Sequence, residues 1–504
     1  MKRFALLAAF AIACSSNVER ATRDVCARGD DEAERIEDAT FAWSAVDEHG
    51  AVRAVRLADF FSTRGELLVV RVQGGAWCGT CRWSAAHTGE LFALPHGDRL
   101  RVLDLVLGDS ENAPATIDDA LGWRASLDAR DRVTVAADPK FALRALVPRT
   151  GTILPMTVLV DARSMTPVAS LANPDPSELA REVDAAFAAI DGTAPRAPAP
   201  EALVDGFFRR NEWDMIRDVT LPSPPPRDAS NAEIALGEAL FFDEGMSPAK
   251  IACATCHDPS RGFGEASANK PNRKTPRIAL AATSKRLFWD GRASTLEEQA
   301  KGPIENPNEM GSSPAFVARR VVSAFGALHR AAFPDHVERD AYDDATKAIA
   351  AYERTLRAKP TALDRYVAGD RRALTALEKQ GLAAFAREGC MQCHFGPRLA
   401  DDAFHVTRTP TGRADGAPDR GRAAIAPNAR EGSFKTPSLR GVARATSFGH
   451  GGVFRSVDAI VASYGDGGLD VRDARAAGER EAWLPRFGET TRWSIDAFLA
   501  TLTE

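Results

Sequence analysis

"IACATCHDPSRGFGE", residues 251–265, contains two cysteines and a histidine in the spacing C-x-x-C-H, and "GCMQCHFGP", which starts at Gly389, contains a second copy. This spacing suits covalent haem attachment, because two thiols add across the haem vinyl groups and the next histidine ligates the iron. A zinc site is the alternative, but zinc needs four ligands in a tetrahedral group. Two copies in one chain therefore predict two c-type haems. The predicted attachment residues are Cys253, Cys256 and His257 for the first haem, and Cys390, Cys393 and His394 for the second.

The composition describes an ordinary globular protein. Its 504 residues suggest about three domains, at roughly 100–200 residues per domain. The hydrophobic content is 44% and the charged content 26%. The net charge of −5, without a block of like charges, gives no sign of a nucleic-acid partner. Six of the eight cysteines form three C-x-x-C pairs, which favours cofactor and redox chemistry over a disulfide scaffold.

The first residues, "MKRFALLAAFAIACSS", resemble a bacterial lipoprotein signal. The apolar run Phe4–Ala13 follows a basic start and is too short to span a bilayer. We therefore expect residues 1–13 to be removed, Cys14 to carry lipid, and residues 14–34 to form a tether. A plain secretory signal is the alternative. Both interpretations export the chain, and the first places it in the periplasm, anchored to a bacterial membrane through the lipid.

The first half of the chain is predicted to be an α/β domain. Apolar runs typical of buried strands alternate with helical patterns, and this alternation indicates an α/β arrangement. The predicted strands are 66–73, 101–108, 133–138 and 156–161, and a helix is predicted at 175–190. Proline-rich stretches at 192–200 and 221–226 indicate a linker, assigned to 193–226, so the two halves are expected to fold separately.

The second half is predicted to be mainly α-helical. Ser230 and Glu233 form a capping box that opens one helix. Apolar residues at helical spacing in 373–389 lead into the second C-x-x-C-H motif, and 491–503 reads as a closing helix. Because each half of this region has one haem motif, we expect two haem domains, at 227–371 and 372–504.

Longer phrases around the two motifs carry a resemblance to a known family. "RLFWDGRASTLEEQAKGPIENPNEMG" (286–311) and "FKTPSLRGVARATSFGHGGVF" (434–454), in order with the two motifs, resemble the bacterial di-haem cytochrome c peroxidase family, which includes the MauG-type enzymes. The resemblance covers about 220–504. It implies two mainly α cytochrome c-type domains that reduce hydrogen peroxide with electrons from a small cytochrome c or cupredoxin.

The resemblance also implies roles for individual residues. The family cleaves peroxide at its first haem, under a glutamine and a glutamate ten residues apart, and Gln299 and Glu309 match both. A carboxylate can move a proton between the peroxide oxygens, and the amide can hold the peroxide. Trp289 matches a tryptophan that relays electrons between the haems. The alternatives are a solvated surface charge for Glu309 and a core aromatic for Trp289.

The chain departs from the peroxidase pattern in three places. Between Asp258 and Leu328 there is no histidine to cap the first iron, which implies a five-coordinate first haem, as in MauG-type members. Gly449 replaces the methionine that ligates the second iron, and this should lower that haem's potential. His450 is then the nearest ligand; the alternatives are an open or water-bound iron, with His450 bonded to a haem propionate. Lys274 replaces a calcium-binding asparagine, and its ammonium argues against a retained calcium although it can take the cation's electrostatic place.

"AWCGTC", which follows a predicted strand, resembles thioredoxin-like proteins of the exported TlpA or redoxin kind, over about 35–192. A thiol at a helix N-terminus has a lowered pKa. The resemblance therefore implies that Cys78 attacks a substrate and Cys81 resolves the mixed disulfide. It also implies a cis-proline, for which Pro155 fits. A structural disulfide is the alternative, and Cys26 lies outside this motif, either free or paired between chains.

Three functions are compatible with these features. The leading hypothesis is an exported di-haem c-type peroxidase with a fused thiol–disulfide redox domain. The second is a MauG-like oxidase that acts on a partner protein or a small molecule. The third is a thiol–disulfide or electron-transfer relay without peroxide turnover. The sequence does not name the electron donor, and it leaves open whether the protein is a homodimer.

Overall fold

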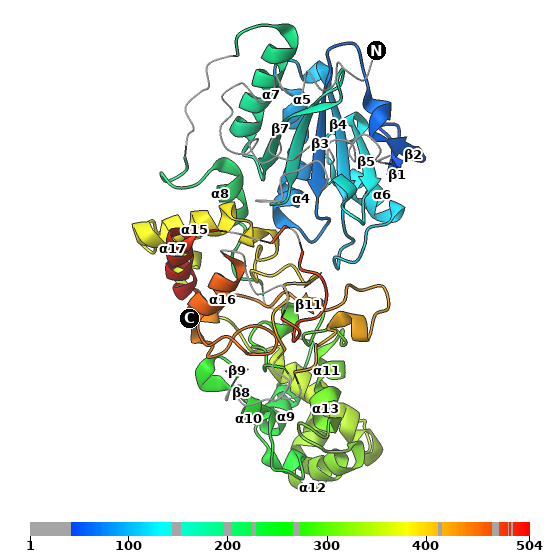
Figure 1. The fold of residues 1–504 in the computed structure, drawn as a ribbon. Helices are drawn as coiled ribbons and strands as arrows, with labels where there is room; N and C mark the ends of the chain where they lie inside the picture. Colours follow the sequence, from blue (N-terminus) through cyan, green and yellow to red (C-terminus); the bar gives the residue numbers. More distant parts are fainter. Residues whose placement is uncertain are drawn as a thin grey trace. The chain divides into compact units, whose positions relative to one another are not determined.

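The protein forms two compact units (Figure 1). The first comprises Met1–Asp109 with Pro114–Ala202, and the second comprises Ser110–Ala113 with Leu203–Glu504. The structure is a computed structural model, and it describes residues 42–143, 153–195, 203–223, 228–265, 273–411, 416–465, 473–481, 483–484 and 487–503. Cys14, Cys26 and the predicted signal and tether lie outside the described residues.

The first unit contains a seven-stranded sheet in the order β2-β1-β5-β4-β3-β6-β7. The central strands β3, β4 and β5 are parallel, and β1, β6 and β7 pair antiparallel with their neighbours. The strands are β1 (Ala42–Val46), β2 (Val52–Arg56), β3 (Leu67–Gln73), β4 (Leu100–Val106), β5 (Val133–Ala137), β6 (Met156–Asp161) and β7 (Thr166–Ala172). The helices are α4 (Gly79–Ala86), α5 (Gly89–Phe92), α6 (Ile117–Ser126) and α7 (Pro176–Asp191), with short 3-10 turns η1 (Leu57–Phe60), η2 (Gly97–Arg99) and η3 (Arg130–Arg132).

All four predicted strands and the predicted helix are present. The strands β3 and β5 are buried along their whole length, which explains why their unbroken apolar runs were readable in the sequence. The outer strands β2 and β7 were not predicted, because most of their side chains are exposed or partly exposed and no apolar pattern marks them. Helix α7 begins at Pro176 behind the N-cap Asp175, as the sequence indicates.

The fold of the first unit is thioredoxin-like, as predicted. Helix α4 follows the central strand β3, and the C-x-x-C pair lies at its first turn, with Cys78 as the N-cap (Figure 1). The Leu154–Pro155 peptide bond is cis, as the resemblance implies. This order of strand, motif-bearing helix and cis-proline places the motif and the proline in one α/β domain.

A buried ion pair lies inside this sheet. Arg71 on β3 donates to both oxygens of Asp104 on β4, at 2.6 and 2.9 Å, and the two residues are register partners of the parallel pair. Thr88 accepts a further hydrogen bond from Arg71, and the Trp123 indole donates to Asp104. Because each charge has several partners, both can stay buried.

The second unit is mainly α-helical, as predicted. Helices α9, α11, α12 and α13 pack together, and α15, α16 and α17 form another group (Figure 1). The helices are α8 (Arg210–Ile216), α9 (Asn231–Phe241), α10 (Cys253–Cys256), α11 (Leu296–Glu305), α12 (Pro314–Ala332), α13 (Ala341–Glu353), α14 (Ala362–Val367), α15 (Ala376–Arg387), α16 (Val457–Tyr464) and α17 (Glu489–Ala500). Two-residue strands pair β8 (His257–Asp258) with β9 (Gly264–Glu265), and β10 (Phe404–His405) with β11 (Phe434–Lys435). Among the described helices, there is none with the length and apolar character that a membrane crossing requires.

Each helical group contains a helix crossing without room for a side chain. A Cβ added to Gly237 in α9 would lie 1.8 Å from the carbonyl oxygen of Ala348 in α13. One turn later, the rings of Phe241 and Tyr352 pack at 5.2 Å between centroids. The glycine lets the two backbones touch, and the aromatic pair fills the space beside the contact.

The second group repeats this arrangement. A Cβ added to Gly381 in α15 would lie 1.8 Å from the carbonyl oxygen of Ser494 in α17. One turn later, Phe385 and Phe498 pack at 5.4 Å. The sequence analysis found helices α9, α15 and α17, but it did not identify these glycines, because each is explained only by its partner helix.

The second unit also includes Ser110–Ala113, which come from the first half of the sequence. Within this unit, the buried Asn112 side chain donates to Glu481 at 2.6 Å. Glu111 accepts hydrogen bonds from two arginines of the same unit. A chain that starts after the linker lacks these residues, so the expectation of a self-contained second half is incomplete.

Replacement of Gly237 or Gly381 by alanine should destabilise the second unit. The added methyl group must push two helix backbones apart, and overpacking of this kind typically costs about 1–3 kcal/mol. Urea unfolding of the haem-loaded protein, followed by Soret absorbance, measures the change.

Gly326→Ala in α12 is the matched control. The nearest atom to its added Cβ is the flexible end of Arg330, at 3.4 Å. Alanine should therefore be neutral there or stabilise the helix by up to about 1 kcal/mol. Equal effects at all three glycines would contradict the role given to the two helix crossings.

Candidate active site

One cavity of about 930 Å³ in the second unit is lined by both C-x-x-C-H motifs. Its lining is mostly apolar, as in sites that hold a large planar cofactor. The motif residues on its wall are Cys253, Cys256, His257, Cys390, Cys393 and His394. The structure thus brings together the six predicted attachment residues, although the two motifs are more than a hundred residues apart in the sequence.

The two motif histidines are oriented in the same way. The Nδ1 atom of His257 lies 3.3 Å from the carbonyl oxygen of Phe263, and that of His394 lies 2.9 Å from the carbonyl oxygen of Leu399. A proton on Nδ1 donated to the carbonyl puts the lone pair on Nε2, which is the tautomer that ligates a metal. Both histidines therefore fit the role of iron ligand.

The motif cysteines also fit haem attachment. All four are free thiols, so none is consumed by a disulfide. Cys253 and Cys256 form the single turn α10, and Cys390 begins the 3-10 turn η9 (Cys390–Gln392). Burial raises the pKa of Cys253 to about 12 and that of Cys393 to about 11. These thiols line the cavity and would hold a haem through its vinyl groups.

Gln299 and Glu309 line the same cavity as the first motif. Gln299 is on α11, and the chain turns back after this helix, where Met310 N donates to the carbonyl of Pro303 at 3.1 Å. Glu309 therefore returns to the wall that Gln299 lines. The Nδ2 atom of Asn306 donates to Glu309 at 3.0 Å and holds its carboxylate.

Trp289 is fixed through both its indole and its backbone. The indole Nε1 donates to the carbonyl of Lys274 at 2.7 Å, and the Trp289 carbonyl accepts from Lys435 N at 2.8 Å. The side chain lines the cavity that both motifs share. This position agrees with both of its sequence-based interpretations, the core aromatic and the relay between haems.

Comparison with known proteins identifies the family of the second unit, in which both C-x-x-C-H motifs lie. Residues 231–372 match the family described as "Di-haem cytochrome c peroxidase". The methylamine utilization protein MauG of Methylorubrum extorquens is 33% identical over 328 residues, which is 62% of this chain and 88% of that protein. The chain belongs to the di-haem cytochrome c peroxidase family.

Two further relatives support this assignment. Cytochrome c551 peroxidase of Pseudomonas aeruginosa is 34% identical over 249 residues, which is 46% of this chain and 71% of that protein. The crystal structure of a MauG-like protein associated with microbial copper homeostasis matches with a TM-score of 0.50 and 25% identity, over 56% of this chain and 95% of that one. As a member of the di-haem cytochrome c peroxidase family, the protein carries two c-type haems and is an oxidoreductase.

The second site differs from the peroxidase pattern at Gly449 and His450. Gly449 has φ +76°, and a Cβ there would lie 2.4 Å from the Thr409 methyl group, so this backbone does not accommodate the larger residue of the pattern. His450 stacks on Phe434 at 3.7 Å, and its Nε2 is buried without a hydrogen-bond partner among the described residues. Burial lowers the pKa of His450 to about 4, so the ring is neutral at neutral pH. A neutral imidazole on the cavity wall fits either sequence-based role, iron ligand or haem contact.

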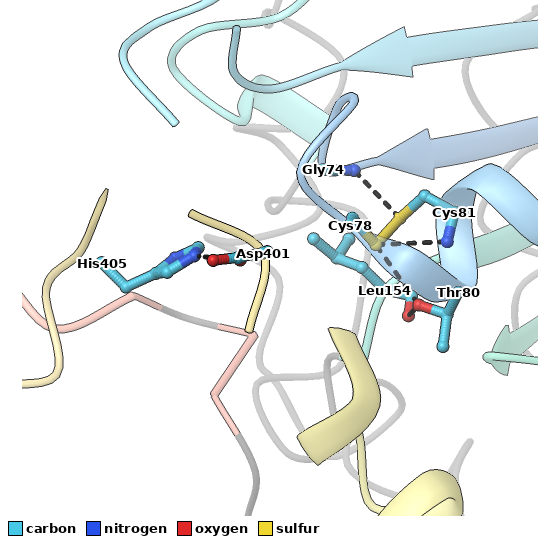
Figure 2. The surroundings of a disulfide bond; sticks show 7 residues. All are labelled: Gly74, Cys78, Thr80, Cys81, Leu154, Asp401 and His405. Carbon is cyan, nitrogen blue, oxygen red and sulfur yellow. Dashed lines mark hydrogen bonds and ion pairs between the residues drawn. A yellow bond between two sulfur atoms is a disulfide. The ribbon is translucent and has the colours of Figure 1, made fainter. Parts of the chain in front are cut away.

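A charged cluster beside Cys393 was not predicted from the sequence. His405 is buried between Asp401, 2.8 Å from its Nε2, and Glu481, 3.0 Å from its Nδ1 (Figure 2 shows the Asp401 pair). Burial opposes protonation, but Cys393, Glu481 and Asp401 together raise the pKa of His405 well above its usual range. Asp401, His405 and Glu481 are far apart in the sequence and belong to no motif, so only the fold reveals their place beside Cys393. Cys393, Asp401 and His405 lie close enough together to hold a metal ion, and attachment of a haem at Cys393 would remove its thiol from such a site.

A second missed group is Glu353, at the end of α13. Its carboxyl group lines the cavity, and burial raises the pKa of Glu353 to about 8, which keeps the group largely protonated at neutral pH. The Cys253 thiol is near enough for Glu353 to raise its pKa. Nothing in the local sequence distinguishes Glu353 from a solvated helix charge.

In the first unit, Cys78 and Cys81 form a disulfide at the start of α4 (Figure 2). The Cys78 sulfur accepts from Cys81 N at 3.2 Å and lies 3.3 Å from the Thr80 hydroxyl. That hydroxyl donates to the carbonyl of Leu154, at 2.8 Å, next to the cis-proline. The residues predicted for thiol chemistry thus form one connected group.

We expect neither haem to show methionine ligation. The only methionine on the described cavity wall is Met310, which follows Glu309 at the first site. The first haem should also be high-spin and bind cyanide without prior reduction, because the sequence between Asp258 and Leu328 contains no histidine to cap the iron. Electron paramagnetic resonance and near-infrared magnetic circular dichroism of the oxidised protein test both expectations.

A methionine-ligated haem in these spectra would show that another methionine reaches an iron. The assignment of Gly449 to the methionine position would then be wrong. Met310→Leu is the control, since it removes the methionine nearest to the cavity and should leave the spectra of the second haem unchanged.

Proposed function

We propose that the protein is an exported peroxidase that reduces hydrogen peroxide to water with electrons from a small cytochrome c or cupredoxin. The observation that carries this proposal is the placement of Gln299 and Glu309 on the cavity wall of the first C-x-x-C-H motif. Membership in the di-haem cytochrome c peroxidase family and the 34% identity to a cytochrome c551 peroxidase support it.

Glu309 is proposed to move the proton that peroxide cleavage requires. The overall step consumes hydrogen peroxide, two protons and two electrons and gives two water molecules. When bound, the first haem supplies the iron at which the O–O bond is cleaved. Glu309 takes a proton from the oxygen nearer the iron and delivers it to the leaving oxygen. Gln299 orients the peroxide, and Asn306 keeps the carboxylate facing the cavity.

Electrons are proposed to enter at the second haem and to pass Trp289 on the way to the first. Trp289 lines the cavity between the described parts of both motifs and is held by two hydrogen bonds. The donor stays unnamed, because no contact in the described residues identifies it.

A MauG-like oxidase is the second candidate. It is favoured by the cavity wall, on which no described methionine lies at the second site, and by the likeness to two MauG-type proteins. In such an oxidase both haems would hold oxidising equivalents and withdraw electrons from a partner protein or small molecule. Fast steady-state turnover with peroxide and a reduced cytochrome or cupredoxin favours the peroxidase; stable oxidation without turnover favours the oxidase.

The first unit is proposed to carry out thiol–disulfide exchange. The Cys78–Cys81 disulfide caps α4, where the helix N-terminus stabilises a thiolate on reduction. The attacking thiol would be Cys78, and Cys81 would resolve the mixed disulfide. Trapping of a mixed disulfide by Cys81→Ser, but not by the double serine variant, tests this assignment.

Export and lipid attachment at Cys14 remain predictions from the first residues, which lie outside the described part of the chain. A periplasmic location agrees with covalent haem attachment, which occurs outside the cytoplasm. Mass spectrometry of the mature N-terminus tests whether the chain begins at Cys14 with a lipid.

Glu309→Gln should leave both haems attached and slow peroxide cleavage by about 10²–10⁴, the usual contribution of a general acid–base group. The amide keeps the shape of the side chain but cannot accept the proton. Stopped-flow absorbance at the first haem measures the rate, and pyridine haemochrome analysis checks that two haems are present.

Asn306→Asp gives a second test of the same carboxylate. It replaces the donor to Glu309 by a negative charge at about the same place, which removes the hydrogen bond that holds the Glu309 carboxylate and should slow peroxide cleavage. Asn231→Asp, which is exposed and does not line the cavity, is the matched control. Peroxide rates that are unchanged in both Glu309→Gln and Asn306→Asp would remove Glu309 from the mechanism.

A further inference from the structure

We propose that Lys274 is a positioning residue, whose ammonium group takes the place of a metal ion and holds Ser447 and Phe448, so that its backbone stays placed to hold Trp289 and His450 in the cavity that both haem motifs share. This inference deepens the proposed function, because it concerns the path by which electrons reach the first haem. Nothing in the pattern of the motifs requires a lysine at this position.

The ammonium group of Lys274 lies among groups that bind cations. Its Nζ donates to the carbonyl of Ser447 and lies 5.2 Å from the centre of the Phe448 ring. The Ser447 hydroxyl in turn donates to the buried carboxylate of Glu265. Burial lowers the pKa of Lys274 to about 8, which leaves the group protonated at neutral pH. Ser447 thus links the Lys274 ammonium group to Glu265 of the β9 strand.

The backbone of Lys274 binds the two elements that the proposal concerns. Its N–H donates to the carbonyl of His450 at 2.7 Å, and its carbonyl accepts from the Trp289 indole at 2.7 Å. Lys274 therefore contacts the proposed relay with one backbone atom and the loop at the second haem with another. Its side chain contacts the same loop three residues earlier, at Ser447.

These contacts close into a ring. The Trp289 carbonyl accepts from Lys435 N at 2.8 Å, and the residue before Lys435, Phe434, stacks on His450 at 3.7 Å. From His450 the ring returns to Lys274 through the 2.7 Å backbone bond. A closed ring resists rotation of the indole, since any movement must break a contact on one side.

A calcium ion does not fit in this place. Calcium takes six to eight oxygen ligands at about 2.3–2.6 Å. Here the Ser447 carbonyl faces a covalently fixed positive charge, and Arg277 is near enough to lower the pKa of the same lysine. A divalent cation would meet two positive groups. Lys274 therefore supplies the positive charge that a cation would supply, and the protein functions without calcium.

The test compares Lys274→Met with the wild type in the full-length, haem-loaded protein. Methionine keeps much of the volume of the lysine stem but removes the charge. The half-reduced protein is mixed with peroxide, and oxidation of the second haem is followed by stopped-flow absorbance. Oxidation of the second haem should slow by about tenfold in Lys274→Met, while peroxide cleavage at the first haem stays unchanged.

Two controls accompany this comparison. Lys301→Met removes an exposed ammonium that pairs with Asp343 at 2.7 Å, and it should leave both rates unchanged. Lys274→Arg keeps a positive charge, and its second haem should be oxidised at close to the wild-type rate. Addition of a calcium chelator, or of calcium, should change neither the spectra nor the rates of the wild type.

The inference would be overturned if a chelator slowed oxidation of the second haem in the wild type. It would also be overturned if Lys274→Met oxidised its second haem at the wild-type rate. A potentiometric titration of both haems keeps this test separate from the proposed function, because it needs no peroxide. Lys274→Met should change the separation between the two midpoints even if no variant reacts with peroxide. If Lys274→Met fails to load haem, Lys274→Arg and the chelator experiment on the wild type still decide the question.

Discussion

Contact between helix backbones at two glycines is the constraint on which the second unit depends. At Gly237 and at Gly381, the neighbouring helix carbonyl occupies the space of a side chain. Each contact fixes the direction of a helix that leads toward a C-x-x-C-H motif; α15, for instance, ends at Arg387, three residues before Cys390. The aromatic pairs beside the crossings then close the apolar interior. The haem cavity is therefore a consequence of how closely these helices approach.

The two C-x-x-C-H motifs hold their histidines in the same way but have different side chains near them. In each half a histidine donates to a carbonyl a few residues ahead, so both irons would be held alike. The two sites differ in the other side chains near them: the first has the Glu309 carboxylate, held by Asn306, and the second has the neutral His450 and the charged cluster around His405. The two sites thus differ in their side chains more than in how their motif histidines are held.

The parts of the molecule that could be predicted from sequence are those encoded locally. Buried strands such as β3, the capped helix α9 and the haem motifs each depend on neighbouring residues, and Gln299 and Glu309 followed from a contiguous phrase. Exposed edge strands such as β7 carry no apolar pattern. Clusters such as that of His405 and Glu481 could not be predicted, because their members meet only after the chain has folded.

The cavity shared by both motifs has a consequence for maturation of the protein. With one haem attached, much of a mostly apolar space of about 930 Å³ stays without its second occupant. Unfilled apolar volume weakens a core, by about 24 cal/mol for each Å³ that does not collapse. A chain with one haem is therefore less stable than the fully loaded chain and more open to proteolysis. Quality control of this protein would then act at the level of haem delivery, and only the chain that has received both cofactors would persist.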